Sequence, residues 1–271
     1  MRFAKGHGTE NDFVILPDPD GALDLTPALV RWLCDRRAGI GGDGVLRVVR
    51  TEALGAPLPE SARSAAACAW FMDYRNADGS VAEMCGNGVR VFARYLIDSG
   101  LAEGPVIDIG TRAGARRATV GADGDVAVAM GEVRTLGKGG AVLAGEDLRG
   151  ARISVGNPHL AVAVDRPVAE FDLRDAPLLD PAQYPEGANL ELFREVEPGV
   201  LEMRVYERGS GETRSCGTGI VAAAAAAAAA GGGGSAWTVR VPGGTCAVTL
   251  DPGGGALLRG PAVIVAEGET R

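Results

Sequence analysis

Two short stretches of similar sequence, Cys85-Gly86-Asn87-Gly88 and Cys216-Gly217-Thr218-Gly219, decide the fold. Each follows a predicted strand and a polar turn. Each also opens an apolar segment with helical character, at residues 89–97 in the first case and 218–230 in the second. The two stretches lie 131 residues apart, about half of the 271-residue chain. A chain of this length is sufficient for two domains of roughly 135 residues each.

The two halves share more than these stretches. Asn76 lies nine residues before Cys85, and Glu207 lies nine residues before Cys216. A turn early in each half also carries an Asn and a His, which are His7 with Asn11 and Asn157 with His159. Self-similarity at a fixed spacing is typical of repeated structural units. We therefore predict that the chain contains two copies of one domain.

The rest of the chain reads mainly as short strands separated by turns. A strand–turn–strand unit is predicted at residues 152–164. The other strands are predicted at residues 3–5, 13–16, 45–49, 69–74, 106–110, 118–120, 126–130, 201–206, 237–241, 247–250 and 263–266.

Four further segments have a distinct local character. Thr26 followed by Pro27 predicts the start of a helix at residues 28–37. Residues 51–64 read as an exposed loop, and residues 131–147 read as an unstructured connection between domains. The glycines at 231–234 are expected to end the second central helix.

Composition and charge exclude several classes of protein. The chain has 35 acidic and 27 basic residues and a net charge of −8, which argues against binding to nucleic acid or to an anionic membrane. The longest apolar run, residues 220–230, is far shorter than the ~20 residues that a membrane-spanning helix needs. The N-terminal residues turn polar at once and contain no apolar signal core. We therefore expect a cytoplasmic protein.

The scarce residue types argue against a metal or an organic cofactor. None of the five cysteines forms a CxxC pair, so a structural zinc site is not expected. The two lysines, Lys5 and Lys138, lie in a predicted strand and a predicted loop, and neither suits the Schiff base of pyridoxal phosphate. Residues 39–44 match the GxGxxG spacing of dinucleotide sites. However, a predicted helix precedes them and a strand follows, which is the reverse of the required order.

Cys85 and Cys216 are the strongest candidates for chemistry. The N-terminus of a helix exposes unpaired N–H groups and the positive end of the helix dipole. We therefore expect a lowered pKa for both thiols. The following glycines, Gly86 and Gly217, would let the backbone wrap around a small carboxylate. The alternative is that these cysteines are buried structural thiols. Two related stretches favour function, whereas the other three cysteines retain the structural interpretation; these are Cys34, Cys68 and Cys246.

Two opposed thiols suggest inversion of a stereocentre. One group must remove a proton from one face of a carbon while the other delivers a proton to the opposite face, and a thiolate with a thiol can do this in both directions. The α-proton of an amino acid is weakly acidic, so the site must stabilise charge that develops on the carboxylate. Two helix N-termini could supply that stabilisation.

A few other polar residues could assist. A His or Glu near a Cys can accept its proton, and His159 and Glu207 are candidates. Glu207 and Arg208 could equally form a plain surface ion pair, and His159 could be a satisfied core residue. Four asparagines fall in turns or short loops, where Asn is common for backbone reasons; these are Asn11, Asn76, Asn157 and Asn189.

Several ordered motifs together resemble the diaminopimelate epimerase family. They run from residue 5 to about residue 245 and are Asn11-Asp12-Phe13, Asn76-Ala77-Asp78-Gly79, Cys85-Gly86-Asn87-Gly88-x-Arg90, Gly156-Asn157-Pro158-His159, Glu207-Arg208-Gly209-x-Gly211-Glu212-Thr213 and Cys216-Gly217-Thr218-Gly219. The resemblance implies an α+β fold with two pseudo-symmetric domains, each a curled mixed sheet or barrel around a central helix, and an active site in the cleft between them. The expected domains are residues 1–130 and 131–261, with residues 262–271 returning to the first.

The resemblance also implies a reaction, the interconversion of LL- and meso-2,6-diaminopimelate for lysine and peptidoglycan synthesis. It implies that Cys85 and Cys216 form the acid/base pair and that His159 and Glu207 assist. The implied substrate ligands are Asn11, Asn76, Gly86, Asn87, Asn157, Asn189, Glu207, Arg208, Gly217 and Thr218. We expect a homodimer that acts on a small amino acid without a cofactor or metal.

Two departures from the family and two alternatives remain. Some members carry Gln where this chain has Gly44, and residues 51–64 look longer than usual. The chain could be another two-thiol racemase, for example for proline or glutamate, although Asn76, Asn189 and Arg208 suit a long diamino acid with a polar distal end. It could also be a catalytically silent binding protein of the same fold, against which both thiols, His159 and Glu207 argue.

Overall fold

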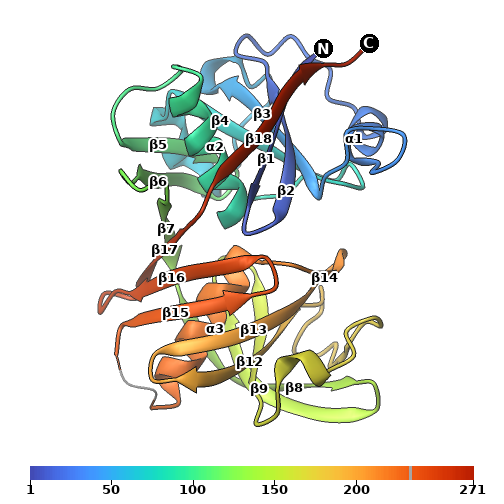
Figure 1. Cartoon of the computed structure of the whole chain (residues 1–271), viewed down its shortest axis with the longest axis vertical. Coiled ribbons are helices and arrows are strands. Elements are labelled where there is room, and N and C mark those ends of the chain that lie inside the picture. Colours follow the sequence, from blue (N-terminus) through green and yellow to red (C-terminus); the bar gives the residue numbers. More distant parts are fainter. Residues whose placement is uncertain (232–233) are drawn as a thin grey trace. The chain divides into compact units, whose positions relative to one another are not determined.

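The computed structural model describes residues 1–231 and 234–271, and the chain folds into two compact units. Unit 1 comprises residues 1–128 and 260–271, and unit 2 comprises residues 129–259. Figure 1 labels their elements. None of the helices in the described ranges is long and apolar enough to cross a membrane.

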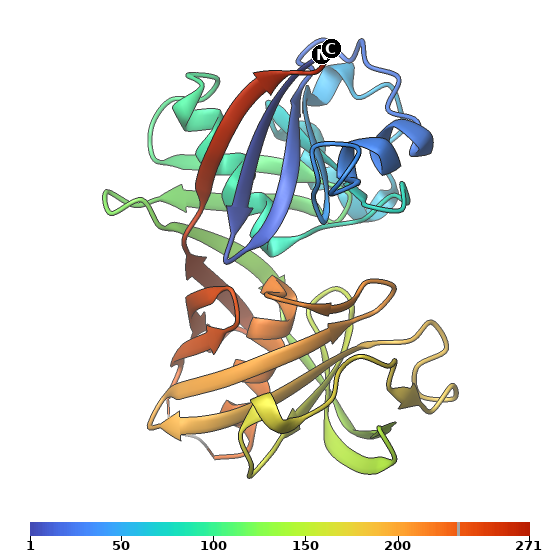
Figure 2. The same ribbon diagram turned by 45° about the vertical axis from the view of Figure 1, so that its right-hand side comes forward.

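Unit 1 is a curled mixed sheet around one helix. Its strands, in spatial order, are β18 (Val263–Glu269), β1 (Arg2–Gly8), β2 (Asn11–Pro17), β3 (Gly44–Arg50), β4 (Trp70–Asn76), β5 (Val106–Thr111), β6 (Gly114–Val120) and β7 (Val126–Glu132). The β2–β3 and β4–β5 pairs are parallel and the other pairs are antiparallel. Figure 2 shows β18, β1 and β2 side by side. Helix α2 (Gly86–Asp98) contacts β18 and every strand from β1 to β6, so it is the centre of the unit.

Unit 2 repeats this arrangement. Its strands, in spatial order, are β8 (Arg134–Leu143), β9 (Glu146–Ser154), β10 (Pro158–Ala163), β12 (Asn189–Glu197), β13 (Val200–Glu207), β15 (Ala236–Val241), β16 (Gly244–Leu250) and β17 (Gly255–Gly260). The β10–β12 and β13–β15 pairs are parallel and the others are antiparallel, which is the sequence of orientations found in unit 1. Helix α3 (Gly217–Ala229) contacts β9, β10, β12, β13, β15 and β16.

Short elements complete each unit. In unit 1 they are α1 (Pro27–Cys34), η1 (Thr51–Ala53) and η2 (Glu60–Ala67). In unit 2 they are η3 (Val168–Glu170), β11 (Leu178–Leu179) beside β8, and β14 (Gly211–Thr213) beside β13. The matching order of strands and helices confirms the predicted α+β class with two pseudo-symmetric domains.

The central helices follow directly from their sequences. Cys85 and Cys216 have extended backbones and occupy the N-cap positions of α2 and α3. Most residues of α3 are alanines with little side-chain volume, and its apolar residues do not gather on one face. A helix that is apolar all round must be buried, and α3 is buried along most of its length. Of the glycines expected to end this helix, Gly232 and Gly233 lie outside the described residues, and the helix ends at Ala229.

The structure corrects the prediction of an unstructured connection at residues 131–147. Most of this segment forms β8 and the start of β9, which are paired from Arg134↔Ser154 to Leu143↔Glu146. Two of its glycines serve close packing, since a Cβ on Gly139 would lie 2.4 Å from the Tyr184 hydroxyl and a Cβ on Gly140 would lie 3.0 Å from the Leu148 carbonyl oxygen. Backbone hydrogen bonds to β9 stabilise β8 even though glycine has a low preference for strands.

Two other expectations are also corrected. The helix predicted at 28–37 ends at Cys34, because Asp35 adopts an extended backbone and its carboxylate accepts hydrogen bonds from the N–H groups of Arg37 and Ala38. The loop predicted at 51–64 contains η1 and the start of η2, which buries Ala62. The start of α1 is as predicted, with Thr26 Oγ1 accepting from the N–H of Leu29 at 3.2 Å.

Candidate active site

In unit 1, Cys85 lies among groups that can hold its proton or stabilise its charge. The N–H of Gly88 donates to Cys85 Sγ at 3.3 Å, which favours the thiolate. The thiol can in turn donate to Asn11 Oδ1, 3.6 Å away. Asn87 Nδ2 donates to the same Asn11 oxygen at 3.2 Å. Unit 1 therefore brings together the Cys85 thiol, Asn11 and Asn87, three residues that the family resemblance implied for the site.

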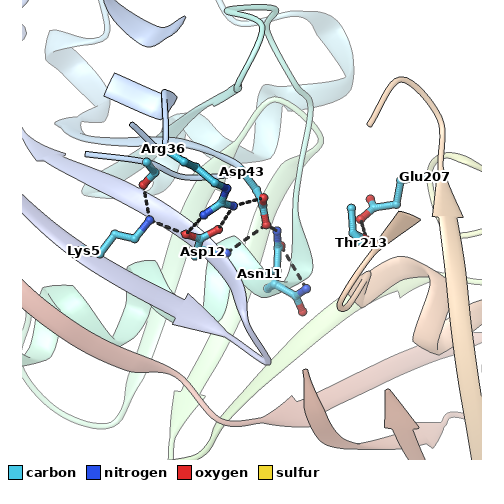
Figure 3. A network of polar contacts seen from close by, with 9 residues as sticks. Lys5, Asn11, Asp12, Arg36, Asp43, Glu207 and Thr213 are labelled. Atoms are coloured by element: carbon cyan, nitrogen blue, oxygen red, sulfur yellow. Dashed lines mark hydrogen bonds and ion pairs between the residues drawn. The ribbon is translucent and has the colours of Figure 1, made fainter. Parts of the chain in front are cut away.

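A cluster of charged side chains lies behind Asn11 (Figure 3). Asp43 Oδ2 accepts from Asn11 Nδ2 at 2.7 Å, while its other oxygen accepts from Arg36 at 2.7 Å. Arg36 also forms a two-pronged contact with Asp12, at 2.7 and 2.9 Å, and Lys5 donates to Asp12 at 2.5 Å. Together these contacts fix the position of Asp43 behind the Asn11 amide.

The two carboxylates of this cluster differ in pKa. Burial raises the pKa of Asp12, but hydrogen bonds from Arg36 and Lys5 outweigh burial and leave that pKa well below its usual range. Burial raises the pKa of Asp43 above its usual value, and the hydrogen bond from Asn11 opposes the effect only in part. Arg36 therefore binds two carboxylates, Asp12 with a lowered pKa and Asp43 with a raised pKa.

Asn76 and Gly44 lie side by side at the ends of β4 and β3. Asn76 is half-buried, and its Nδ2 donates to Ser80 Oγ at 3.0 Å. A Cβ on Gly44 would lie 2.5 Å from the carbonyl oxygen of Arg75 and 2.6 Å from the ring of Tyr74. The position has no room for the glutamine that some family members carry, so a side-chain contact to substrate from residue 44 is not available here.

In unit 2, Cys216 is buried and lies near two carboxylates, those of Glu207 and Glu191. Its side chain is only 6% exposed, and Sγ lies 3.4 Å from Thr218 Oγ1. Burial raises the pKa of Cys216 well above its ordinary value, and the carboxylates of Glu207 and Glu191 raise it further. The prediction of a lowered pKa is therefore wrong for this thiol, because desolvation and two carboxylates outweigh the helix N-terminus.

His159 is completely buried in unit 2 and has two oxygen neighbours. Its Nδ1 lies 2.7 Å from Glu191 Oε1, and its Nε2 lies 2.9 Å from Asn157 Oδ1. Asn157 Nδ2 donates to Thr218 Oγ1 at 3.4 Å. The structure thus places His159 next to Asn157 and Glu191, and one further contact links Asn157 to the start of α3.

Glu207, Arg208 and Asn189 gather where β13 and β12 meet. Glu207 accepts a hydrogen bond from the Thr213 hydroxyl (Figure 3). Asn189 Oδ1 accepts from the backbone N–H of Arg208 at 2.9 Å, and Arg208 Nη1 donates to the carbonyl of Glu186 at 3.0 Å. The Arg208 side chain is 43% exposed and its ion pair with Glu186 is long, at 3.7 Å, so the side chain remains accessible to a ligand.

Gly86 and Gly217 are the first residues of α2 and α3, with Asn87 and Thr218 directly behind them. The first N–H groups of a helix have no partner within it, so each unit presents N–H donors beside a thiol. Such a pair can bind a carboxylate and exchange a proton with a neighbouring carbon. Among residues 1–231 and 234–271, no group of His, Cys, Asp and Glu side chains is arranged to hold a metal ion.

Two carboxylates of these sites were missed by the sequence interpretation. Asp43 lies in the 39–44 stretch, which was considered only as a nucleotide loop, and Glu191 lies in β12, which was not predicted. Each binds a predicted site residue 32 positions away in the sequence. No local pattern in the sequence points to either carboxylate, because each partner lies on a different element.

The fold is found in several solved structures. A PhzF-family phenazine biosynthesis protein of Bacillus anthracis has a TM-score of 0.70 at 18% identity, with 100% of this chain and 99% of the other covered. A probable proline racemase of Agrobacterium radiobacter also has a TM-score of 0.70, at 16% identity, with 100% of this chain and 92% of the other covered. The chain therefore has the two-domain fold of the proline racemase and PhzF class.

The chain belongs to the diaminopimelate epimerase family, which it matches over residues 3–136 and 152–265. It is 67% identical to the diaminopimelate epimerase of Thermobifida fusca, over 100% of this chain and 98% of that protein. It is 51% identical to the diaminopimelate epimerase of Rhodococcus opacus, over 99% and 96% of the two chains. The predicted resemblance is confirmed, and the protein is an isomerase of the epimerase type.

Proposed function

We propose that the protein interconverts LL- and meso-2,6-diaminopimelate in the synthesis of lysine and of peptidoglycan precursors. The observation that carries this proposal is a pair of thiols in equivalent positions, Cys85 at the start of α2 and Cys216 at the start of α3. The names of the relatives support the substrate, since proteins called diaminopimelate epimerase match nearly the whole chain.

The proposed chemistry uses one thiolate and one thiol. One removes the α-proton of the substrate, the other delivers a proton to the opposite face, and the reverse reaction exchanges their roles. The raised pKa of Cys216 supports its presence as the thiol in the substrate-free protein. Cys85, which accepts a hydrogen bond from Gly88, then serves as the first base.

The proposed substrate ligands come from both units. The N–H groups at Gly86-Asn87 and Gly217-Thr218 would bind the carboxylate next to the reacting carbon and stabilise its growing negative charge. Asn11 and Asn157 would bind polar groups near the same carbon. Asn76, Asn189 and Arg208 would bind the distal amino and carboxylate groups, while His159 and Glu207 assist the thiols.

We further propose that the protein acts in the cytoplasm as a homodimer and needs neither metal nor pyridoxal phosphate. The acidic net charge supports a protein that binds neither nucleic acid nor anionic membranes. Activity that persists after treatment with a chelator and with a carbonyl reagent would support the cofactor-free mechanism, and its loss would contradict it.

The mechanism is tested by epimerisation in heavy water. Product formed early should carry deuterium at the inverted carbon, while unreacted substrate should keep its proton, because different groups remove and deliver the hydrogen. Chiral chromatography and mass spectrometry measure both. Substrate that exchanged its proton as fast as product appeared would require a single base instead.

Replacement of either cysteine tests the assignment of the pair. Cys85→Ala and Cys216→Ala should each abolish turnover in both directions, and the double variant should be no worse, because the pair works as one unit. Cys246→Ala, at a buried thiol outside the proposed site, is the matched control and should retain activity. Substantial activity in either single variant would require another mechanism, whereas an unsubstituted protein without activity would favour the binding-protein alternative. Activity on proline or glutamate, and none on diaminopimelate, would favour the other racemases.

A further inference from the structure

The buried pair of His159 and Glu191 has no counterpart in the other unit. In unit 1, Phe13 of β2 lies opposite Gly44 of β3, and Leu46 lies two residues further along β3. In unit 2, His159 of β10 lies opposite Asn189 of β12, and Glu191 lies two residues further along. Position by position, His159 corresponds to Phe13, and Glu191 corresponds to Leu46.

The central helices confirm this correspondence independently. A Cβ on Gly88 of α2 would lie 3.2 Å from Leu46 Cδ2. A Cβ on Gly219 of α3, the matching glycine, would lie 2.7 Å from Glu191 Oε1. Leu46 and Glu191 therefore face the same position of their helices.

The fold itself does not need a polar pair at this position. Phe13 and Leu46 are fully buried in unit 1, and His159 and Glu191 are fully buried in unit 2. A buried ion pair is often no more stabilising than apolar side chains of similar volume, because both charges lose their hydration. Glu191 Oε2 also lacks a hydrogen-bond partner in the described part of the chain. Such a cost indicates a role in function.

A continuous series of contacts leads from this pair to the thiol. It runs from Glu191 to His159 (2.7 Å), on to Asn157 (2.9 Å), then to Thr218 (3.4 Å) and finally to Cys216 Sγ (3.4 Å). Asn157 Nδ2 faces Thr218, so the Asn157 oxygen faces the imidazole. Both ring nitrogens thus face oxygen atoms, and a ring that carries a proton on each nitrogen would donate to both.

We propose that Glu191 is a positioning residue that keeps His159 protonated on both nitrogens, so that the ring fixes the Asn157 amide in the orientation that reaches Thr218 beside Cys216. Without the negative charge, the buried ring loses its counterion and becomes neutral. The nitrogen facing Asn157 can then lose its proton, and the amide is free to turn over. The effect on turnover rests on the proposed epimerase function, whereas the protonation of the ring does not.

The ring protonation is tested by nitrogen NMR of protein labelled with ¹⁵N-histidine. The chain has only two histidines, His7 and His159, and His159→Phe assigns the signals. In the unsubstituted protein at neutral pH, both His159 nitrogens should resonate as protonated nitrogens. In Glu191→Gln, one should move to the position of an unprotonated nitrogen. A neutral ring before the substitution, or an unchanged ring after it, would overturn the proposal.

The kinetic test separates positioning from general damage. Glu191→Gln should reduce kcat on LL-diaminopimelate by about 10- to 100-fold with a smaller change in KM, as expected for loss of a group that orients acid/base machinery. Glu195→Gln, on the same strand with an exposed side chain, is the matched control and should leave kcat unchanged. An unchanged kcat in Glu191→Gln would overturn the proposal.

Replacing His159 and Glu191 by the residues at the corresponding positions of unit 1, Phe and Leu, tests whether the polar pair serves only the stability of the fold. The double variant His159→Phe/Glu191→Leu should keep a melting temperature at least as high as that of Glu191→Gln, and its turnover should be as low or lower. A lower melting temperature, or normal turnover, would assign the polar pair to folding and overturn the proposal. If the unsubstituted protein fails to epimerise diaminopimelate, the proposed function falls, while the nitrogen spectrum still decides the role of Glu191.

Discussion

The Asn11 amide has one orientation in which both of its ends are satisfied. Its Nδ2 faces the Asp43 carboxylate, and its Oδ1 faces Asn87 Nδ2 and the Cys85 thiol. If the Asn11 amide were reversed, its oxygen would face the Asp43 carboxylate and its nitrogen would face the Asn87 nitrogen. Asp43 thus keeps the Asn11 oxygen turned toward Cys85, where it can accept the thiol proton whenever Cys85 carries one.

Asp43→Ala is therefore expected to reduce kcat/KM on diaminopimelate by on the order of tenfold, because the Asn11 amide loses its fixed orientation. Steady-state kinetics measure the change, with Asp20→Ala as a control at an exposed aspartate. Unchanged kinetics in Asp43→Ala would show that the Asn87 contact alone orients the amide.

Arg208 offers a second test at the same scale. A guanidinium can bind a carboxylate through two parallel hydrogen bonds, which an ammonium group cannot reproduce. Arg208→Lys should therefore lower kcat/KM by more than about tenfold. Glu186→Gln removes the long ion pair of Arg208 and should have little effect, because the Glu186 side chain is 86% exposed. Equal effects of both variants would return Arg208 to a surface ion pair.

The sequence predicts the parts of each site that have a local signature. Both thiols are recognised from the glycine-rich stretches that open the central helices, and the asparagines from the motifs around them. Asp43 and Glu191 were not recognised, because each acts through a partner 32 residues away. The raised pKa of Cys216 was also missed, since it depends on burial and on carboxylates from β12 and β13. Tertiary packing, which sequence periodicity does not describe, decides all three.

At the scale of elements, the predicted helix starts are correct because neighbouring residues set them. Two strands were missed because contacts between distant segments set them. The start of α1 follows from Thr26 and Pro27, and the starts of α2 and α3 follow from their cysteines. The strand β8 was missed because it is rich in glycine, and two of these glycines, Gly139 and Gly140, serve close packing. The strand β12 was also missed, and its Glu191 is buried because it pairs with His159 of β10, a contact that the sequence pattern does not show.

The two central helices differ in their tolerance of a methyl group at the matching glycine. Gly219→Ala would force a Cβ against Glu191 Oε1, whereas Gly88→Ala would meet Leu46 at 3.2 Å, a contact that a small shift relieves. We expect Gly219→Ala to destabilise the protein by about 1–3 kcal/mol and Gly88→Ala to cost less, since alanine also favours the helix. Thermal unfolding of the two variants measures the difference. A lower melting temperature for Gly88→Ala would contradict this order.

At the scale of the whole molecule, two carboxylates of unit 1 tie stability to pH. Asp12 is bound by Arg36 and Lys5. The buried Asp73 is bound by Arg75 at 2.9 Å and Arg112 at 2.8 Å. Burial raises both pKa values, but the basic partners outweigh it and hold them below the usual range. The unfolded chain therefore binds protons at a higher pH than the folded chain does.

The free energy of unfolding should consequently fall as the pH drops below about 4, where unfolded aspartates take up protons, and continue to fall through the lower folded pKa values. Asp12→Asn should flatten this dependence, removing on the order of 1–3 kcal/mol of it. Urea unfolding at a series of pH values measures the slope, and Asp20→Asn is the exposed control. An unchanged slope in Asp12→Asn would contradict the prediction.

The return of β18 to unit 1 has a consequence for synthesis on the ribosome. The strand that covers the edge of β1 is translated after all of unit 2, so the first sheet lacks one member until β18 leaves the ribosome. Until β18 arrives, the backbone of β1 presents an unpaired edge to other nascent chains. Premature termination before residue 263 therefore leaves an aggregation-prone edge on unit 1 rather than a shortened enzyme.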